Sequence, residues 1–136
     1  KECPDVYFEI TPTVSIMNVY HLPDFHKDWI GRGLLEPQNV RMNILTYPTE
    51  YRIQIIPPKE RKKFIDKYTE HIKWIDDNFG DGAAKRGFES VLDFLQQENY
   101  ENLIPDFIDR NTPLDKLRGE SLYQVAPELE FFRDYE

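Results

Sequence analysis

Asn18 and Tyr20 are the polar side chains best placed for a chemical role, because they close the apolar run of residues 13–20. Val14 and Ile16 precede them at every second position, so all four share one face of a predicted strand. A buried amide needs hydrogen-bond partners, and ligands of barrels and open parallel sheets bind at the carboxyl ends of strands. Asn18 is therefore either a ligand-facing group at such an edge or a turn residue satisfied by the chain itself.

His21, Asp24 and His26 lie close together in the chain and have the side-chain types of a metal site. His21 precedes the short helix predicted here, so the pair lacks the one-turn spacing of ligands on a helix. We expect two solvated histidines and no metal. Cys3 is the only cysteine, so the chain alone forms no internal disulfide and no cysteine-ligated zinc or iron–sulfur site. We expect a frayed terminal thiol.

The basic cluster at residues 59–63 is the stretch that suggests contacts to phosphate. The whole chain has 17 Lys and Arg against 25 Asp and Glu, a net charge of −8 and a pI of about 4.9. Binding to a nucleic-acid backbone depends on cations gathered on a basic surface. We expect a solvated helix face at 59–63 and no nucleic-acid partner.

The sequence contains no glycine-rich phosphate loop, no nucleophile elbow and no Ser/His/Asp or Cys/His arrangement. Glu9 and Asp93 are the carboxylates nearest to buried positions by pattern, and we expect both to be exposed. We therefore assign no catalytic residue and no metal ligand.

The elements that hold these residues begin with strands. Alternating apolar residues predict about four strands within the first 57 residues, at 6–10, 13–20, 40–45 and 51–56. The mixed faces of 13–20 are typical of a strand covered on both sides in a parallel sheet. The clean alternation at 51–56 indicates a strand with one wet face.

About four helices are predicted after the strands, and a short one between them. Helical spacing places the short helix at 23–30 and the next at 58–79. Another follows the break at 80–82 and ends at about residue 98, and a further one begins at about residue 103 with Pro105 in its first turn. Capping residues predict further helix starts at Thr112–Pro113, Ser121–Gln124 and Pro127. The predicted fold class is α/β or α+β. Residues 1–136 form a single domain or fragment, with a strand-rich part at 1–57 and a helical extension at 58–136.

Length and composition favour a folded domain. A chain of 136 residues with 40% hydrophobic and 14% aromatic residues can bury a core and is not of the disordered class. No apolar run reaches membrane-spanning length and no signal peptide is visible, so we expect a cytoplasmic protein without a membrane partner. The first residue is Lys1 rather than Met, and a strand pattern follows almost at once, so we expect a fragment or a processed product.

Three stretches carry a resemblance to a known family: Thr13–Tyr20, Tyr51–Pro57, and the closing pattern Leu114-Asp115, Arg118, Ser121 and Pro127-Glu128-Leu129. In this order they resemble the carboxyl-terminal part of radical S-adenosylmethionine proteins. More narrowly, they resemble the twitch domain-containing group that is frequent in phage genomes. The resemblance covers residues 12–132 as a string of moderate similarities.

The resemblance implies that this chain supplies the end of a partial β/α barrel and the extension that follows it. It also implies S-adenosylmethionine and a four-iron four-sulfur (4Fe-4S) cluster as cofactors of the full-length protein. Asn18 and Tyr20 would lie at the mouth of the barrel as cofactor-binding residues. The three-cysteine motif that holds the cluster is absent from this sequence, so no cofactor is expected to bind this chain alone.

Two functions stay open. The first is the carboxyl-terminal segment of a radical S-adenosylmethionine enzyme, which is not catalytic by itself and whose partner is the missing amino-terminal half. The full-length protein would be an enzyme if it carries the three-cysteine motif. The second is a stand-alone, non-enzymatic domain that binds another protein through an apolar patch. The aromatic residues proposed for that patch are Tyr123, Phe131, Phe132 and Tyr135.

Overall fold

The computed structural model describes residues 3–136, which form a mostly helical α/β-type fold with two short parallel strands. The strands and α-helices of these residues are β1 (Thr13–Val14), α1 (Leu22–Gly31), β2 (Asn43–Ile44), α2 (Pro58–Phe79), α3 (Ala83–Leu95), α4 (Ile104–Arg118) and α5 (Leu122–Val125). Four 3-10 segments accompany them: η1 (Thr49–Tyr51), η2 (Ile53–Ile55), η3 (Glu101–Leu103) and η4 (Pro127–Tyr135).

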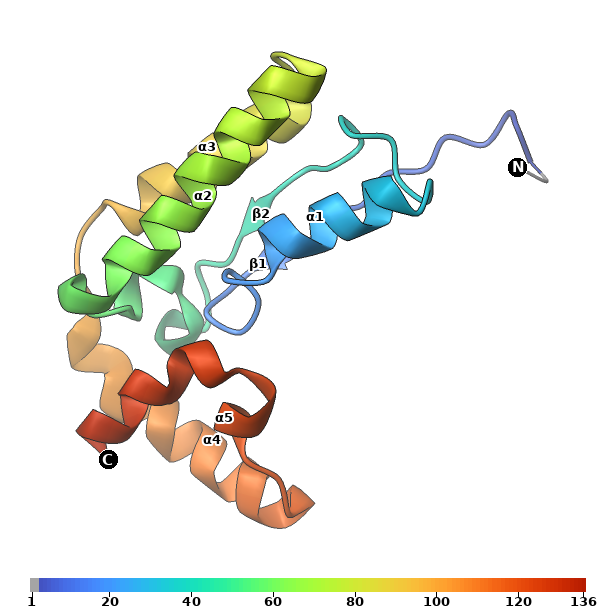
Figure 1. The fold of residues 1–136 in the computed structure, drawn as a ribbon. Helices are drawn as coiled ribbons and strands as arrows, with labels where there is room; N and C mark the ends of the chain where they lie inside the picture. The colour runs from blue at the N-terminus through green and yellow to red at the C-terminus, as the bar shows by residue number, and fades with distance from the viewer. Residues whose placement is uncertain (1–2) are drawn as a thin grey trace.

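The two strands and the helix between them form a small β–α–β unit. β1 pairs with β2 in parallel, with Thr13 opposite Asn43, and an isolated bridge joins Ile10 to Val40 further upstream. α1 forms the connection and lies beside the pair, while the arm of residues 3–12 leads away from the body (Figure 1). This unit contains all the strands of residues 3–136, so the prediction of four strands is wrong.

The predicted strands fail for different reasons. Residues 51–56 form two 3-10 turns, and Gln54 is as buried as Ile53 and Ile55, so the alternation does not mark one wet face. The predicted strand 13–20 ends after Val14, because the chain turns back on itself through Asn18. Residues 6–10 form no strand, and their single bridge joins Ile10 to Val40, which precedes β2.

The α2–α3 hairpin is the largest helical unit, and α2 has the bounds that the sequence predicts. Pro58 opens α2, where its missing N–H costs nothing. Gly80 ends it with φ +74° and ψ −166°, a conformation that is essentially restricted to glycine. The N-terminus of α3 is capped from a distance, since the N–H of Ala84 donates to Oε1 of Gln38 at 3.1 Å.

The carboxyl-terminal helices differ from the prediction at two capping points. Thr112–Pro113 does not start a helix, because α4 continues through it from Ile104 to Arg118. Ser121 makes no side-chain cap. Instead the N–H of Leu122 donates to Oδ2 of Asp115 at 2.7 Å, which satisfies an otherwise open donor of α5.

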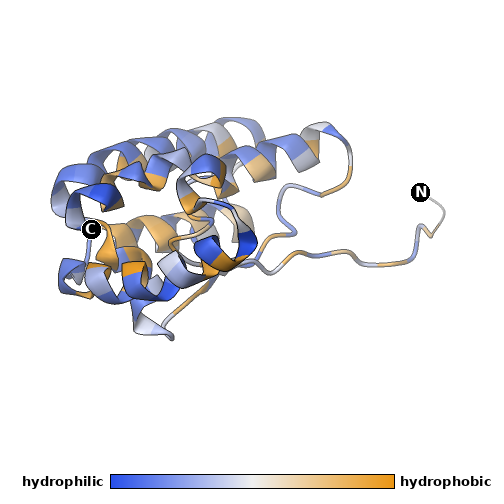
Figure 2. Ribbon diagram, turned by 90° about the horizontal axis from the view of Figure 1, so that it is seen from below, coloured by the Kyte–Doolittle hydropathy of each residue, from blue (hydrophilic) through white to orange (hydrophobic). Residues whose placement is uncertain are grey.

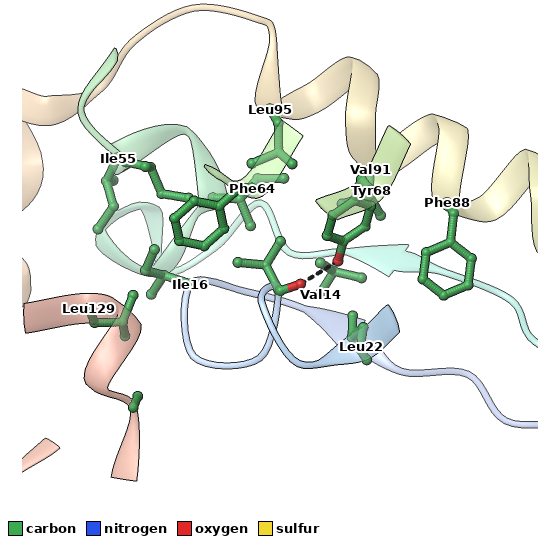
Figure 3. Close-up of a cluster of buried hydrophobic side chains, with 14 of the residues drawn as sticks. Val14, Ile16, Leu22, Ile55, Phe64, Tyr68, Phe88, Val91, Leu95 and Leu129 are labelled. Carbon is green, nitrogen blue, oxygen red and sulfur yellow. Dashed lines mark hydrogen bonds between the residues drawn. The ribbon is translucent and has the colours of Figure 1, made fainter. Parts of the chain in front are cut away.

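The core lies where the β–α–β unit, the α2–α3 hairpin and η4 meet. Figure 3 shows Val14 and Leu22 facing Phe64, Tyr68 and Phe88 across this junction. The hydroxyl of Tyr68, fully buried, donates to the carbonyl of Val19 and so joins α2 to the turn after β1. Hydrophobic residues gather on the inner sides of the helices, whereas the outer sides are hydrophilic (Figure 2).

Candidate functional site

The side-chain amide of Asn18 bonds to the backbone groups at the outer edge of β1. Its Nδ2 donates to the carbonyl of Thr13 at 2.9 Å, and its Oδ1 accepts from the N–H of Ser15 at 2.9 Å. A neighbouring strand would bond the same two backbone groups, so the side-chain amide takes the place of such a strand. The two bonds use one of the two N–H donors and one of the two oxygen lone pairs of the amide. The cofactor-binding role of Asn18 stays a prediction.

The outer edge of the chain is open just before this amide. The backbone of Ile10 faces the segment before β2, where its N–H donates to the carbonyl of Asn39 at 3.0 Å and its carbonyl accepts from the N–H of Arg41 at 3.0 Å. Glu9 and Thr11 alternate with it and therefore turn outward. Within residues 3–136 no hydrogen bond reaches the backbone N–H or C=O of either residue. Their four backbone groups are available to a further strand.

The opposite edge, along β2, is covered by α3. Gly87 of α3 approaches so closely that a methyl group on it would lie 3.0 Å from Cγ of Met42. Gln38 reaches the start of the same helix through its bond to Ala84. Helix α3 therefore occupies this side of the pair at Gln38 and Met42, whereas the side of β1 is open at Glu9 and Thr11.

Tyr20 lies in a charged cluster rather than in a hollow. Nζ of Lys67 is 3.7 Å from the centre of the Tyr20 ring and donates to Oδ2 of Asp24 at 2.6 Å. The ring also packs edge-on against Phe64. Neither Tyr20 nor Asn18 lines the hollow beside the arm or the one beside Ile108 and Pro113. The cofactor-binding role of Tyr20 likewise stays a prediction.

His21 extends this charged cluster toward η4. Its Nε2 lies 2.7 Å from Oε1 of Glu128, whose carboxylate is almost completely buried, although the two atoms are not aligned as a good hydrogen bond. Nζ of Lys63 donates to the backbone carbonyl of Glu128 at 2.9 Å. The contacts tie the turn after β1 and helix α2 to the last segment of the chain. They leave no group aimed at an open space.

The prediction of two solvated histidines is right for His21, which is half exposed, and wrong for His26. Both His26 and His71 are 1% exposed, and Nδ1 of His26 lies 2.9 Å from Nε2 of His71. The sequence contained a signal for His71, because it lies three residues after Tyr68 and four before Ile75, on the apolar stripe of α2. In residues 3–136 no three His, Cys, Asp or Glu side chains are grouped to hold a metal ion.

Arg61 is a buried side chain whose role the sequence analysis did not predict. It belongs to the basic cluster that was expected to be solvated, yet it is only 7% exposed. Its five N–H groups donate to five backbone carbonyls, those of Gln54, Ile56, Leu95, Gln97 and Glu98, at 2.7–3.2 Å. Arg61 therefore joins η2 to the carboxyl end of α3. Its role is structural.

The predicted aromatic patch is not exposed, and the exposed apolar side chains of residues 3–136 lie at several places, among them the arm, Tyr47, Leu117 and Val125. Phe132 is fully buried, and Tyr123, Phe131 and Tyr135 are half-buried against the core, so the proposed patch does not exist. On the arm Val6 is 67% exposed and Tyr7 69% exposed. The arm and the loop after α1 enclose a hollow of about 580 Å³ that is lined by both apolar and polar residues, among them Cys3, Val6, Phe8, Leu34 and Asn39.

The single thiol of Cys3 does not fit a 4Fe-4S cluster, which takes several cysteines. No helix among the described residues is long and apolar enough to cross a membrane. No family model matches the chain, and neither the curated proteins nor the solved structures include a match to it.

Proposed function

We propose that this chain is a non-catalytic assembly segment, the carboxyl-terminal part of a larger α/β enzyme of the radical S-adenosylmethionine kind. Its β1 side accepts the neighbouring strand of a larger parallel sheet. The observation that carries the proposal is the outward backbone of Glu9 and Thr11, which has no hydrogen-bond partner within residues 3–136.

The size of the strand pair supports this proposal. β1 and β2 have two residues each, whereas parallel sheets occur almost only with several strands and with both faces covered. α1 and the α2–α3 hairpin already provide helical cover beside the pair (Figure 1). Each backbone hydrogen bond that an added strand makes contributes about 0.5–1.5 kcal/mol. Four such groups on Glu9 and Thr11 would therefore contribute a few kcal/mol.

In this proposal the chemistry belongs to the rest of the enzyme. The 4Fe-4S cluster and S-adenosylmethionine would be bound there, and we route no step through this chain. Asn18 and Tyr20 are the residues that the family resemblance would bring nearest to S-adenosylmethionine. In this chain Asn18 bonds to the backbone of Thr13 and Ser15, and the ring of Tyr20 lies against Lys67.

A second candidate is a stand-alone domain that pairs with a strand of another protein. The exposed Val6 and Tyr7 favour it, because they flank the free edge and provide apolar contacts for alternate side chains of an added strand. In both candidates the added strand pairs with the backbone of Glu9 and Thr11. They differ in whether that strand comes from the same protein or from another one. The reading frame upstream of Lys1 separates them: three closely spaced cysteines are expected for the first candidate, and an initiation codon directly before Lys1 would refute it.

Hydrogen exchange tests the pairing itself. The amides of Glu9 and Thr11 are expected to exchange rapidly in the 136-residue chain and at least tenfold more slowly in the product of the complete reading frame. The amides of Ile10 and Arg41 already bond within the chain and serve as the slow control in both samples. Equal rates for Glu9 and Thr11 in the two samples would refute the proposed pairing.

A matched pair of variants at Thr11 adds a second test. Thr11→Pro removes an outward N–H that has no partner in residues 3–136, so it weakens an added strand and leaves the β1–β2 pairing in place. Thr11→Val keeps the N–H and serves as control. In the complete protein only Thr11→Pro is expected to restore fast exchange at Glu9; the same result with Thr11→Val would show that the backbone N–H is not what matters.

A further inference from the structure

The buried imidazoles of His26 and His71 meet where helix α1 touches helix α2. Nδ1 of His26 and Nε2 of His71 are 2.9 Å apart, and Nε2 of His26 lies 2.9 Å from the carbonyl oxygen of Pro37. The pair therefore joins three parts of the chain: α1, the loop that follows α1, and α2. Phe88 of α3 covers both rings, with centroids 5.1 Å from His26 and 4.4 Å from His71.

The hydrogen-bond partners fix the protons of the neutral pair. A carbonyl oxygen only accepts, so Nε2 of His26 carries the proton that is donated to Pro37. Nδ1 of His26 is then an acceptor, and Nε2 of His71 must donate to it. Nδ1 of His71 is left with a bare lone pair, and it is buried without any partner among residues 3–136.

A further proton has no good position in this arrangement. On Nδ1 of His26 it would face the N–H of His71, so two donors would oppose each other. On Nδ1 of His71 it would form a buried cation whose new N–H has no acceptor. Burial lowers the pKa of His26, and burial together with the charge of His26 lowers the pKa of His71 to about 3.

Other charged groups also act on His71. Its surroundings are Asp24 and Lys27 of α1, Lys67 of α2, the ring of Phe88 of α3 and the loop carbonyl of Pro37. Both lysines oppose protonation of His71 and only Asp24 favours it. Asp24 is bound by Lys67 at 2.6 Å, so it does not compensate the added charge.

We propose that the His26–His71 pair is a proton-operated joint, at which protonation separates α1 and its following loop from the α2–α3 hairpin. The unfolded or opened histidines bind protons near pH 6.5 and the closed pair does not. The closed state is therefore favoured above that pH and loses stability as the pH falls. This inference does not depend on the proposed assembly function, which concerns the backbone of Glu9 and Thr11.

Native-state hydrogen exchange on the full chain tests the joint, because each amide reports an opening constant once its intrinsic rate is known. From pH 7 to pH 5 the opening constant of α1 amides is expected to rise about 25-fold for one histidine that titrates at 6.5 when open and at 3 when closed. The interior amides of α2 and α3 are expected to open with a higher free energy. If the amides of α1 and α2 have the same opening free energy at every pH, the two helices open together and the proposal is overturned. This comparison needs no variant.

Variants assign the effect to the pair. The double variant His26→Gln/His71→Phe removes both titrating rings, and its α1 opening constant is expected to change less than threefold between pH 7 and pH 5. His21→Gln is the matched control, since His21 is the third histidine and lies outside the pair. It is expected to keep the full rise; a full rise in the double variant, or its loss in His21→Gln, would overturn the assignment.

Discussion

Replacing Arg61 with lysine is expected to destabilise this chain strongly, although the positive charge is kept. The guanidinium of Arg61 uses all five of its N–H donors on backbone carbonyls. A lysine has three donors on one nitrogen and lacks the planar fork. It therefore leaves at least two carbonyls unpaired, and its ammonium stays in the same buried position.

The magnitude follows from the number of lost partners. The carbonyls of Ile56 and Leu95 are buried at their contacts with Arg61, so water does not replace the guanidinium there, whereas those of Gln97 and Glu98 are partly open. A buried polar group without a partner costs about 1–3 kcal/mol. Two such groups give an expected loss of about 2–6 kcal/mol in the free energy of unfolding, out of a total that is about 5–15 kcal/mol for a typical domain.

Urea denaturation followed by circular dichroism measures this loss. The control is Arg86→Lys, the same substitution at an exposed position of α3, where the guanidinium makes only a 3.8 Å ion pair with Asp81. The control is expected to stay within about 0.5 kcal/mol of the original chain. If Arg61→Lys also stays within that range, the five carbonyl bonds do not hold η2 against the end of α3, and the reasoning is refuted.

Three further predictions concern single residues. Gly80→Ala is expected to destabilise the chain by about 1–3 kcal/mol, because Gly80 has a positive φ. Gly31→Ala is expected to stabilise it by up to about 1 kcal/mol, because the space around Gly31 at the end of α1 is open. Melting temperatures that shift in the same direction for both variants would contradict this. Asp115→Ala is expected to cost about 1 kcal/mol and Ser121→Ala less than 0.5 kcal/mol, since only Asp115 caps α5; equal urea midpoints would count against it. The lowered pKa of His71, about 3, means that the unfolded chain binds a proton below pH 6.5 that the folded chain does not. The free energy of unfolding is therefore expected to fall by about 2 kcal/mol from this residue between pH 7 and pH 5, and urea curves that coincide at the two pH values would refute it.

Helix α2 shows what the sequence can predict. Its apolar residues repeat with the helical period over six turns, and Pro58 and Gly80 mark its ends by their own backbone preferences. No distant contact is needed to find these bounds, so the prediction and the structure agree.

The strand predictions failed because they depended on contacts far along the chain. The predicted strand 51–56 has the period of a strand, but Ile53–Ile55 form a 3-10 turn in which Gln54 is buried like the two isoleucines. Arg61 looks like any cation of a solvated helix face, since three of its partners lie 34–37 residues away in the sequence. For Asn18, the residue type shows that a partner is needed but not that the partner is the chain's own backbone.

The amide of Asn18 has a consequence for how many molecules can join together. Strand edges that stay free on both sides of a sheet allow endless stacking into fibrils. Here α3 approaches the β2 side at Met42, and Asn18 bonds the outward backbone groups of Thr13 and Ser15. If a neighbouring strand joins at Glu9 and Thr11 as proposed, these two features oppose the addition of further strands, so the association would end after one step and would not lead to a fibre.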